Sequence, residues 1–168
     1  MNRIHIYADG SCMNINDESR AGWGIVIVHG DDGLGRGRGT ISEEFYGLVQ
    51  IDPGSDDWKG ALLASNNTAE LTALLEGLRW VNQYDGGEEI TIRCDSMYAI
   101  EIAEGRWKAK ANLELVDVVR AALSAARVGR GVELNHVRGH EGHRWNERAD
   151  HLARSAAEGK KPKGLSFW

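Results

Sequence analysis

The stretch that decides the fold is Ile4-His5-Ile6-Tyr7-Ala8-Asp9-Gly10-Ser11, close to the start of the chain. By the two-residue period of a strand, its apolar side chains fall on one face, and His5, Tyr7 and Asp9 fall on the other. Gly10 and Ser11 end the run, so Asp9 lies at the carboxyl end of an apolar strand. Ligands bind at that edge in α/β sheets. Taken alone, Asp9 has a simpler interpretation as the residue that opens a turn.

A second predicted strand ends in the same way, as Ile90-Thr91-Ile92-Arg93-Cys94-Asp95-Ser96. If the two strands lie side by side and parallel, Asp9 and Asp95 point into one small volume. Two adjacent carboxylates repel each other and require a cation or a shared proton. The repeated ending therefore favours a ligand site over two unrelated turns.

Composition places the chain among ordinary water-soluble globular proteins. It has 168 residues, of which 42% are hydrophobic and 27% charged, and its formal net charge is −5. One domain with a real core suits this length, and the negative charge argues against bulk electrostatic binding of nucleic acid. The first twenty residues hold no long apolar run, so we expect neither a signal peptide nor a membrane span. Two cysteines predict free thiols and a cytoplasmic protein.

The remaining elements predict an α/β fold. Further strands are expected at 25–28, 40–49 and 131–137, helices at 66–84, 96–104, 113–127 and 145–158, and loops at 12–21, 30–39 and 50–65. Three antiparallel strands, extended by two parallel strands through right-handed crossovers, give a mixed five-stranded sheet flanked by helices. We expect a single domain over residues 1–158, followed by a basic, flexible tail at 159–168.

Two further acidic residues lie near the starts of predicted helices. Asn67 and Glu70 have the three-residue spacing of a capping box, which explains Glu70 without any function. Asp150 lies near the start of the last helix and, alone, is a solvated acid. Each has a simple explanation by itself. The functional interpretation is that both converge with Asp9 and Asp95 at one edge of the sheet.

The chain resembles the type 1 ribonuclease H family in four blocks that follow the family's order. The blocks are residues 7–12, 66–71, 94–98 and 137–150, and the resemblance extends from residue 4 to about residue 157, apart from the segment that precedes residue 66. It implies that Asp9, Glu70, Asp95 and Asp150 hold divalent metal and that His140 assists the reaction. The implied substrate is an RNA–DNA hybrid, of which the enzyme cleaves the RNA strand.

The chemistry of phosphodiester cleavage suits these residue types. It requires a nucleophilic water, a neutralised phosphate and a stabilised leaving oxygen, which two divalent ions about 3.5–4 Å apart supply together. Carboxylate oxygens favour Mg²⁺, with Mn²⁺ as an alternative. We expect two ions when substrate is bound, and a strained site when metal is absent. His140, in a glycine-flanked loop, is suited to move a proton near neutral pH or to help product leave.

The same histidine loop offers zinc as an alternative, through His136, His140 and His143. The spacing of His140 and His143 is one residue short of the zinc-protease motif. The chain also has no cysteine pair to complete a structural zinc site. The sequence therefore favours the carboxylate site.

Substrate contacts follow from the resemblance and from one basic stretch. By resemblance, the backbone of Gly10, Ser11 and Cys12 meets the minor groove of the hybrid, where 2′-hydroxyls distinguish RNA from DNA. Asn66 and Asn67 are implied to do the same, although either is equally suited to cap a helix.

In place of the long basic helix and loop of many relatives, the chain has only a short basic stretch. Trp107, Lys108 and Lys110 are its candidate contacts with the DNA strand, and the alternative is a solvated turn with a buried tryptophan. Met97 stands where some relatives carry a glutamine.

Three functions are compatible with these features of the sequence. The first is a monomeric, metal-dependent endonuclease that cuts the RNA of RNA–DNA hybrids, with 5′-phosphate and 3′-hydroxyl ends. The second is a nuclease of the same fold that acts on another duplex or a junction. The third is a module that binds hybrids without catalysis, which predicts the loss of at least one metal-binding acid. The sequence retains all four.

Overall fold

A five-stranded sheet forms the centre of the protein in a computed structural model, which describes residues 3–138 and 143–168. The strands are β1 (Arg3–Ile15), β2 (Glu18–His29), β3 (Thr40–Leu48), β4 (Glu89–Cys94) and β5 (Val132–His136). Their order across the sheet is β3-β2-β1-β4-β5. β1 pairs antiparallel with β2 and parallel with β4, and β4 pairs parallel with β5. The predicted mixed sheet is confirmed.

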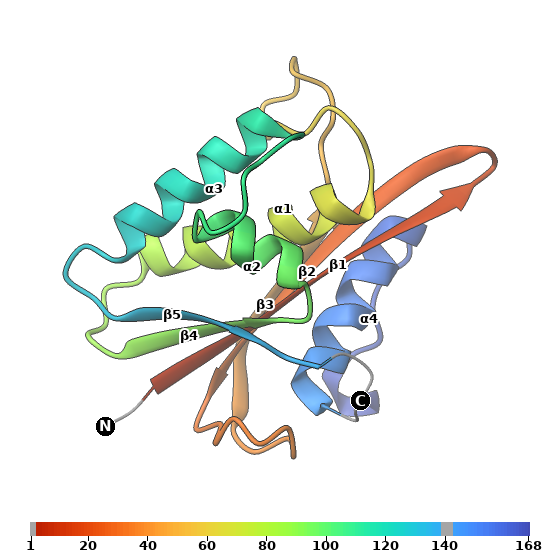
Figure 1. The fold of residues 1–168 in the computed structure, drawn as a ribbon. Helices are drawn as coiled ribbons and strands as arrows, with labels where there is room; N and C mark the ends of the chain where they lie inside the picture. The colour runs from red at the N-terminus through yellow and green to blue at the C-terminus, as the bar shows by residue number, and fades with distance from the viewer. Residues whose placement is uncertain (1–2, 139–142) are drawn as a thin grey trace.

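Helices cover both faces of this sheet (Figure 1). α1 (Asn66–Gln83), α2 (Met97–Ala103) and α3 (Leu113–Ala126) lie on one face, and α4 (Arg144–Glu158) lies on the other. A short 3-10 helix, η1 (Leu165–Phe167), follows near the end of the chain. The order of strands and helices is the predicted one. In the part of the chain that the structure describes, no helix combines the length and apolarity that crossing a bilayer requires.

The main core lies between the sheet and α1. The apolar stripe of α1, with Leu71, Leu74 and Leu78, is fully buried against Ile6 of β1 and Ile92 of β4. Burial of each such side chain stabilises the fold by about 1.5–3 kcal/mol. This packing fixes the first turn of α1 over the place where the pairing of β1 with β4 ends.

The segment after Cys12 is not the loop that was predicted over residues 12–21. β1 continues to Ile15, and β2 begins at Glu18. The turn between them consists of Asn16 and Asp17, whose φ angles are 53° and 63°. Two successive left-handed residues make the two-residue turn that matches the twist of a hairpin, and Asn and Asp tolerate it. This hairpin extends beyond the core, so both of its faces carry polar side chains. Those polar side chains are the reason that the sequence suggested a loop.

Three glycines allow the helices to approach the sheet closely. A Cβ at Gly10 would lie 2.3 Å from the backbone carbon of Ala69 in α1. On the other face, Cβ atoms at Gly24 and Gly22 would lie 2.7 Å and 2.2 Å from backbone carbonyl oxygens of α4. Gly24 is also the partner of Asp9 across β1 and β2. The glycines therefore set the distance between both helices and the part of the sheet that carries Asp9.

The last residues of the chain lie against α4. Arg148 is buried, donates a hydrogen bond from Nη1 to the carbonyl oxygen of Lys163 at 2.8 Å, and lies 5.3 Å from the ring of Trp168. The backbone N–H of Lys163 donates to Nε2 of His151 at 2.9 Å. These contacts connect the tail to the helix that carries Asp150. The flexibility expected of this tail stays a prediction.

Candidate active site

Three carboxylates meet where the parallel pairing of β1 with β4 ends. β1 itself continues past Asp9 to Ile15, so Asp9 is not at the end of its strand as the sequence suggested. The parallel register places Ala8 beside Cys94, so Asp9 and Asp95 follow the last paired residues of the two strands. Glu70 reaches the same place from the first turns of α1. One carboxylate oxygen from each of the three lies within 4.8 Å of the other two. The predicted proximity of Asp9 and Asp95 is confirmed, and Glu70 joins them.

The electrostatics of this cluster favour a bound cation. Asp9 is 3% exposed, and burial raises its pKa strongly, with further increases from the charges of Glu70, Asp95 and Asp150. Burial, followed by the charge of Asp95, raises the pKa of Glu70 to about 8. The N–H of Gly10 donates to Oδ1 of Asp9 at 2.9 Å.

A buried oxygen of Glu70 tests whether this cluster fits a metal ion. Oε2 of Glu70 is buried and has no hydrogen-bond partner among the described residues. A buried acceptor without a partner costs about 1–3 kcal/mol, and a cation beside it would remove both this cost and the repulsion between the carboxylates. The residues therefore fit a metal ion, and the cluster is suited to hold one.

Asp150 lies near the cluster but not within it. Its charge raises the pKa of both Asp9 and Glu70. Its own Oδ2, however, lies 2.6 Å from Nη2 of Arg154, one turn further along α4. The structure thus brings three of the four predicted acids together and holds the fourth beside them in an ion pair. A metal-binding role for Asp150 stays a prediction.

The start of α1 corrects the predicted capping box. Ser65, not Asn67, caps the helix: its Oγ accepts from the N–H of Thr68 at 3.1 Å, and Thr68 Oγ1 accepts from the N–H of Ser65 at 2.9 Å. Glu70 takes no part in capping, so the structural explanation for this residue is wrong. The sequence did contain a signal for the correct cap, because Ser65 and Thr68 have the same three-residue spacing as Asn67 and Glu70.

The histidine loop is only partly described. His140 lies outside the described residues. His136 contacts the carbonyl oxygen of Asp95 through Nε2 at 3.1 Å, and the ring of His143 lies 5.1 Å from that of Tyr7. In residues 3–138 and 143–168, the group of side chains suited to a metal contains no histidine.

The predicted contacts with the minor groove lie around the carboxylates. β4 pairs with β1 only as far as Ala8, so this edge of β1 has no strand partner at Gly10–Cys12. Asn66 and Asn67 are exposed in the first turn of α1. Because Ser65 caps the helix, neither asparagine is required for that purpose. Met97, at the start of α2, is 44% exposed.

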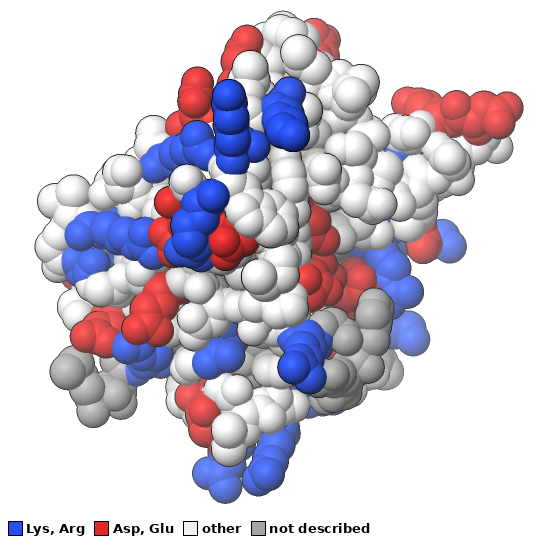
Figure 2. All heavy atoms as spheres, in the orientation of Figure 1, with Lys and Arg blue, Asp and Glu red and all other residues white. Residues whose placement is uncertain are grey.

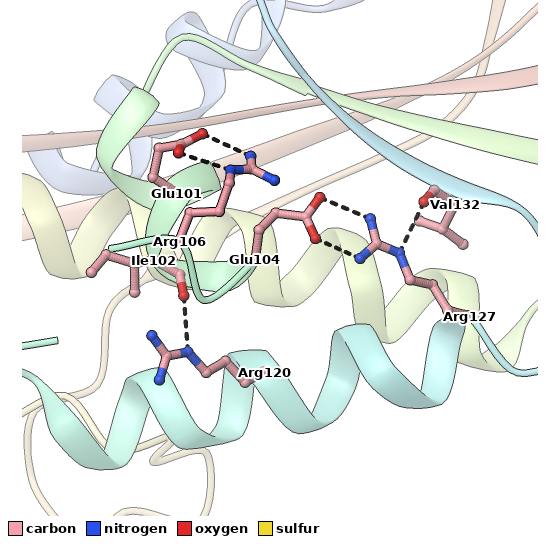
Figure 3. Close-up of polar contacts among 7 residues, drawn as sticks. All are labelled: Glu101, Ile102, Glu104, Arg106, Arg120, Arg127 and Val132. Carbon is pink, nitrogen blue, oxygen red and sulfur yellow. Dashed lines mark hydrogen bonds and ion pairs between the residues drawn. The ribbon is translucent and has the colours of Figure 1, made fainter. Parts of the chain in front are cut away.

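Ion pairs shape the turn that follows α2 (Figure 3). Arg106 forms a bidentate ion pair with Glu101, in which Nε and Nη2 of the arginine donate to the two carboxylate oxygens at 2.9 Å and 2.7 Å. Arg120 of α3 donates to the carbonyl oxygens of Ile102 at 2.9 Å and Trp107 at 3.2 Å. Arg106 is therefore occupied within the protein, and the turn is anchored to α3.

The basic stretch itself faces solvent. The Trp107 side chain is 47% exposed, which contradicts the alternative of a buried tryptophan, and Lys108 and Lys110 are exposed as well. Figure 2 shows acidic atoms gathered between α2 and α4, with Lys and Arg atoms on either side. The contact of these three residues with a DNA strand stays a prediction.

The mixed sheet with its acidic edge has the architecture of ribonuclease H-like domains, and comparisons with known proteins agree. The RNase H family model matches residues 1–158. The Ribonuclease H of Janthinobacterium sp. strain Marseille is 33% identical over 94% of this chain and 98% of its own. The chain belongs to the ribonuclease H family.

Solved structures support the same fold. RNase H1 from the archaeon Halobacterium salinarum NRC-1 matches with a TM-score of 0.65 and 26% identity, over 94% of this chain and 98% of that one. LC11-RNase H1, solved in complex with an RNA/DNA hybrid, matches with a TM-score of 0.64 and 21% identity, over 93% and 97% of the two chains.

Proposed function

We propose that this enzyme hydrolyses the RNA strand of RNA–DNA hybrids and leaves 5′-phosphate and 3′-hydroxyl ends. The observation that carries the proposal is the cluster of Asp9, Glu70 and Asp95, with its buried, unpartnered oxygen, in a chain of the ribonuclease H family. The LC11 relative with a bound hybrid supports the substrate class. The free cysteines suit a cytoplasmic enzyme, and we expect it to act as a monomer.

Divalent metal, Mg²⁺ or alternatively Mn²⁺, is the proposed cofactor, with two ions in the complex with substrate. Asp9, Glu70 and Asp95 would hold it, and Asp150 would complete the set after it leaves Arg154. When bound, the ions activate a water molecule and neutralise charge on the phosphate. Carboxylate oxygens suit these cations.

The chain's other groups would orient the substrate and move protons. The unpaired edge of β1 at Gly10–Cys12 and the exposed Asn66 and Asn67 are proposed to contact 2′-hydroxyls in the minor groove. His140 is proposed to transfer a proton to the leaving oxygen or to help product leave. These contacts would select RNA for cleavage, because only that strand carries 2′-hydroxyls.

The two lysines of the basic stretch should carry much of the salt-sensitive affinity. Replacing Lys108 and Lys110 with Ala should flatten the slope of log affinity against log salt by about one to two units, because each phosphate contact contributes about one. Binding of a labelled hybrid across a salt series measures this slope. An unchanged slope would show that the turn is merely solvated.

A panel of duplexes tests the proposed substrate. The protein is incubated with Mg²⁺ and end-labelled RNA–DNA, RNA–RNA or DNA–DNA duplexes of one sequence. We expect cleavage of the RNA strand of the hybrid alone. Preferential cleavage of another duplex would favour the second function, and binding to the hybrid without cleavage would favour a non-catalytic module.

A further inference from the structure

The glycine-rich loop between β2 and β3 folds back over the sheet face that carries α4. The hydroxyl of Tyr7 donates to the carboxylate of Asp31, which is buried 4.0 Å from Nδ1 of His5. Arg93 of β4 donates from Nε to the same His5 nitrogen at 3.0 Å. Residues from three segments therefore form one buried polar network, and the guanidinium of Arg93 lies at its margin.

A pocket of about 260 Å³ opens beside Arg93. The groups that matter in its lining are Arg93, Arg138, His136, His143, Gly33 and Gly35. Within residues 3–138 and 143–168, neither Arg93 nor Arg138 forms an ion pair with a carboxylate. A pocket with two arginines that pair with no described carboxylate is suited to an anion, because a guanidinium binds phosphate through two parallel hydrogen bonds.

The acidic residues of the loop, Asp31 and Asp32, have other partners, so they form no ion pair with Arg93 or Arg138. Asp31 accepts from Tyr7 and from the N–H of Gly33 at 3.0 Å. Asp32 accepts from the N–H of Leu34 at 3.0 Å and lies 3.5 Å from Nε of Arg38. The positive charge of the pocket therefore comes from side chains and not from free backbone N–H groups.

Glycine is required where the loop crosses the pocket. Gly33 and Gly35 have φ angles of 76° and 79°, in the left-handed region. A Cβ at Gly33 would lie 2.6 Å from Nη2 of Arg93, and one at Gly35 would lie 2.7 Å from Cδ2 of His143. Any larger residue would push into the groups that line the pocket. The glycines thus keep this pocket open as a feature of the fold.

β4 connects the pocket with the carboxylate cluster, because it carries Arg93 and leads directly to Asp95. Arg93 of β4 precedes Asp95 by two residues, and its partner across the strand pairing, Tyr7, precedes Asp9 by two residues on β1. Two residues of a strand span about 7 Å, so the backbone of Arg93 lies about that far from the backbone of Asp95. His136, in the pocket lining, contacts the backbone of Asp95.

We propose that this pocket is a phosphate subsite, in which Arg93 and Arg138 hold a backbone phosphate of the hybrid whose RNA strand lies at the carboxylate cluster. The inference rests on the proposed function. It gives an acidic protein a second phosphate contact, on the side of the cluster away from the lysines of the basic stretch. The contact of His136, which lines the pocket, with the backbone of Asp95 favours a strand phosphate over a free anion.

Binding measurements in the inactive Asp9→Asn background test the subsite without cleavage. The variants are Arg93→Gln and Arg138→Gln, and Arg79→Gln on α1 is the control with the same change of charge. Arg138 is exposed, so its replacement leaves the buried network intact even if Arg93→Gln disturbs it. Each pocket variant should lower the slope of log affinity against log salt by up to about one unit, and the control should not.

Hybrids with a single uncharged methylphosphonate linkage then locate the contact. At one linkage near the cleaved bond, the uncharged substitution should weaken binding by the parent. The same substitution should not weaken binding by Arg138→Gln any further, because that variant has already lost the contact. If hybrid binds but no linkage shows this coupling, the subsite is overturned and the proposed function stands. Saturable binding of inorganic phosphate in the absence of such coupling overturns it in favour of a free-anion site. Failure of the parent to bind hybrid at all would overturn both.

Discussion

Asp9→Asn is expected to abolish cleavage of hybrids while leaving the metal-free protein at least as stable as the parent. Asp9 is buried beside Glu70 and Asp95, and its folded pKa is raised above the ordinary value of 3.8. An acid with a raised folded pKa favours folding while it is protonated and loses that contribution as the pH rises above 3.8. Asparagine resembles the protonated form, so it should relieve the repulsion at neutral pH, by about 1 kcal/mol.

Thermal melts of the parent and Asp9→Asn, with and without magnesium, measure this effect. If magnesium binds the folded protein as proposed, it should raise the melting temperature of the parent and raise that of the variant much less. If Asp9 were an ordinary turn residue, Asp9→Asn would barely change activity, because asparagine serves turns as well as aspartate does. A variant that stays active, or that melts much lower in chelator, would remove Asp9 from the metal site.

Gly10→Ala is expected to damage both stability and turnover. The added Cβ would lie 2.3 Å from the backbone carbon of Ala69 and 2.5 Å from the backbone nitrogen of Glu70. Backbone atoms cannot rotate away, so α1 must shift from β1, at a cost of about 1–3 kcal/mol or more. A displacement of about 1 Å in a reacting group lowers a rate by about a hundredfold, and Glu70 would move with the helix.

Gly87→Ala is the matched control, since no heavy atom lies within 4 Å of a Cβ at that position. Urea unfolding and cleavage rates of the two variants should separate clearly, with Gly87→Ala close to the parent in both. Parent-like stability and rate in Gly10→Ala would mean that α1 and β1 are not in the close contact described for them.

Most of the fold was predictable because its signals are local. Alternating residues in β1 and the helical spacing of the leucines in α1 each indicate one buried face. The hairpin turn at Asn16 and Asp17 was missed because its strands carry polar residues beyond the core. The helix cap was missed because two pairs of residues have the same spacing, and only the position of the first turn selects Ser65 over Asn67.

The candidate site was predictable to the extent that strand ends and family resemblance indicate it. Asp9 and Asp95 follow from matching strands, whereas the spacing around Glu70 also allowed a capping role and the resemblance favoured the site. The pair of Asp150 with Arg154 depends on side-chain conformation, which spacing does not determine. The pocket at Arg93 depends on the hydrogen bond of Tyr7 with Asp31, across 24 residues of sequence, and no local pattern indicates such a contact.

Metal dependence of RNA cleavage tests the central claim most directly. A hybrid with a labelled RNA strand is incubated with the parent protein in Mg²⁺, in excess chelator, and in chelator followed by excess Mg²⁺. We expect RNA fragments with 5′-phosphate ends in the first and third reactions and intact RNA in the second. Robust cleavage in excess chelator would contradict the assignment of the carboxylate cluster as a metal-dependent nuclease site.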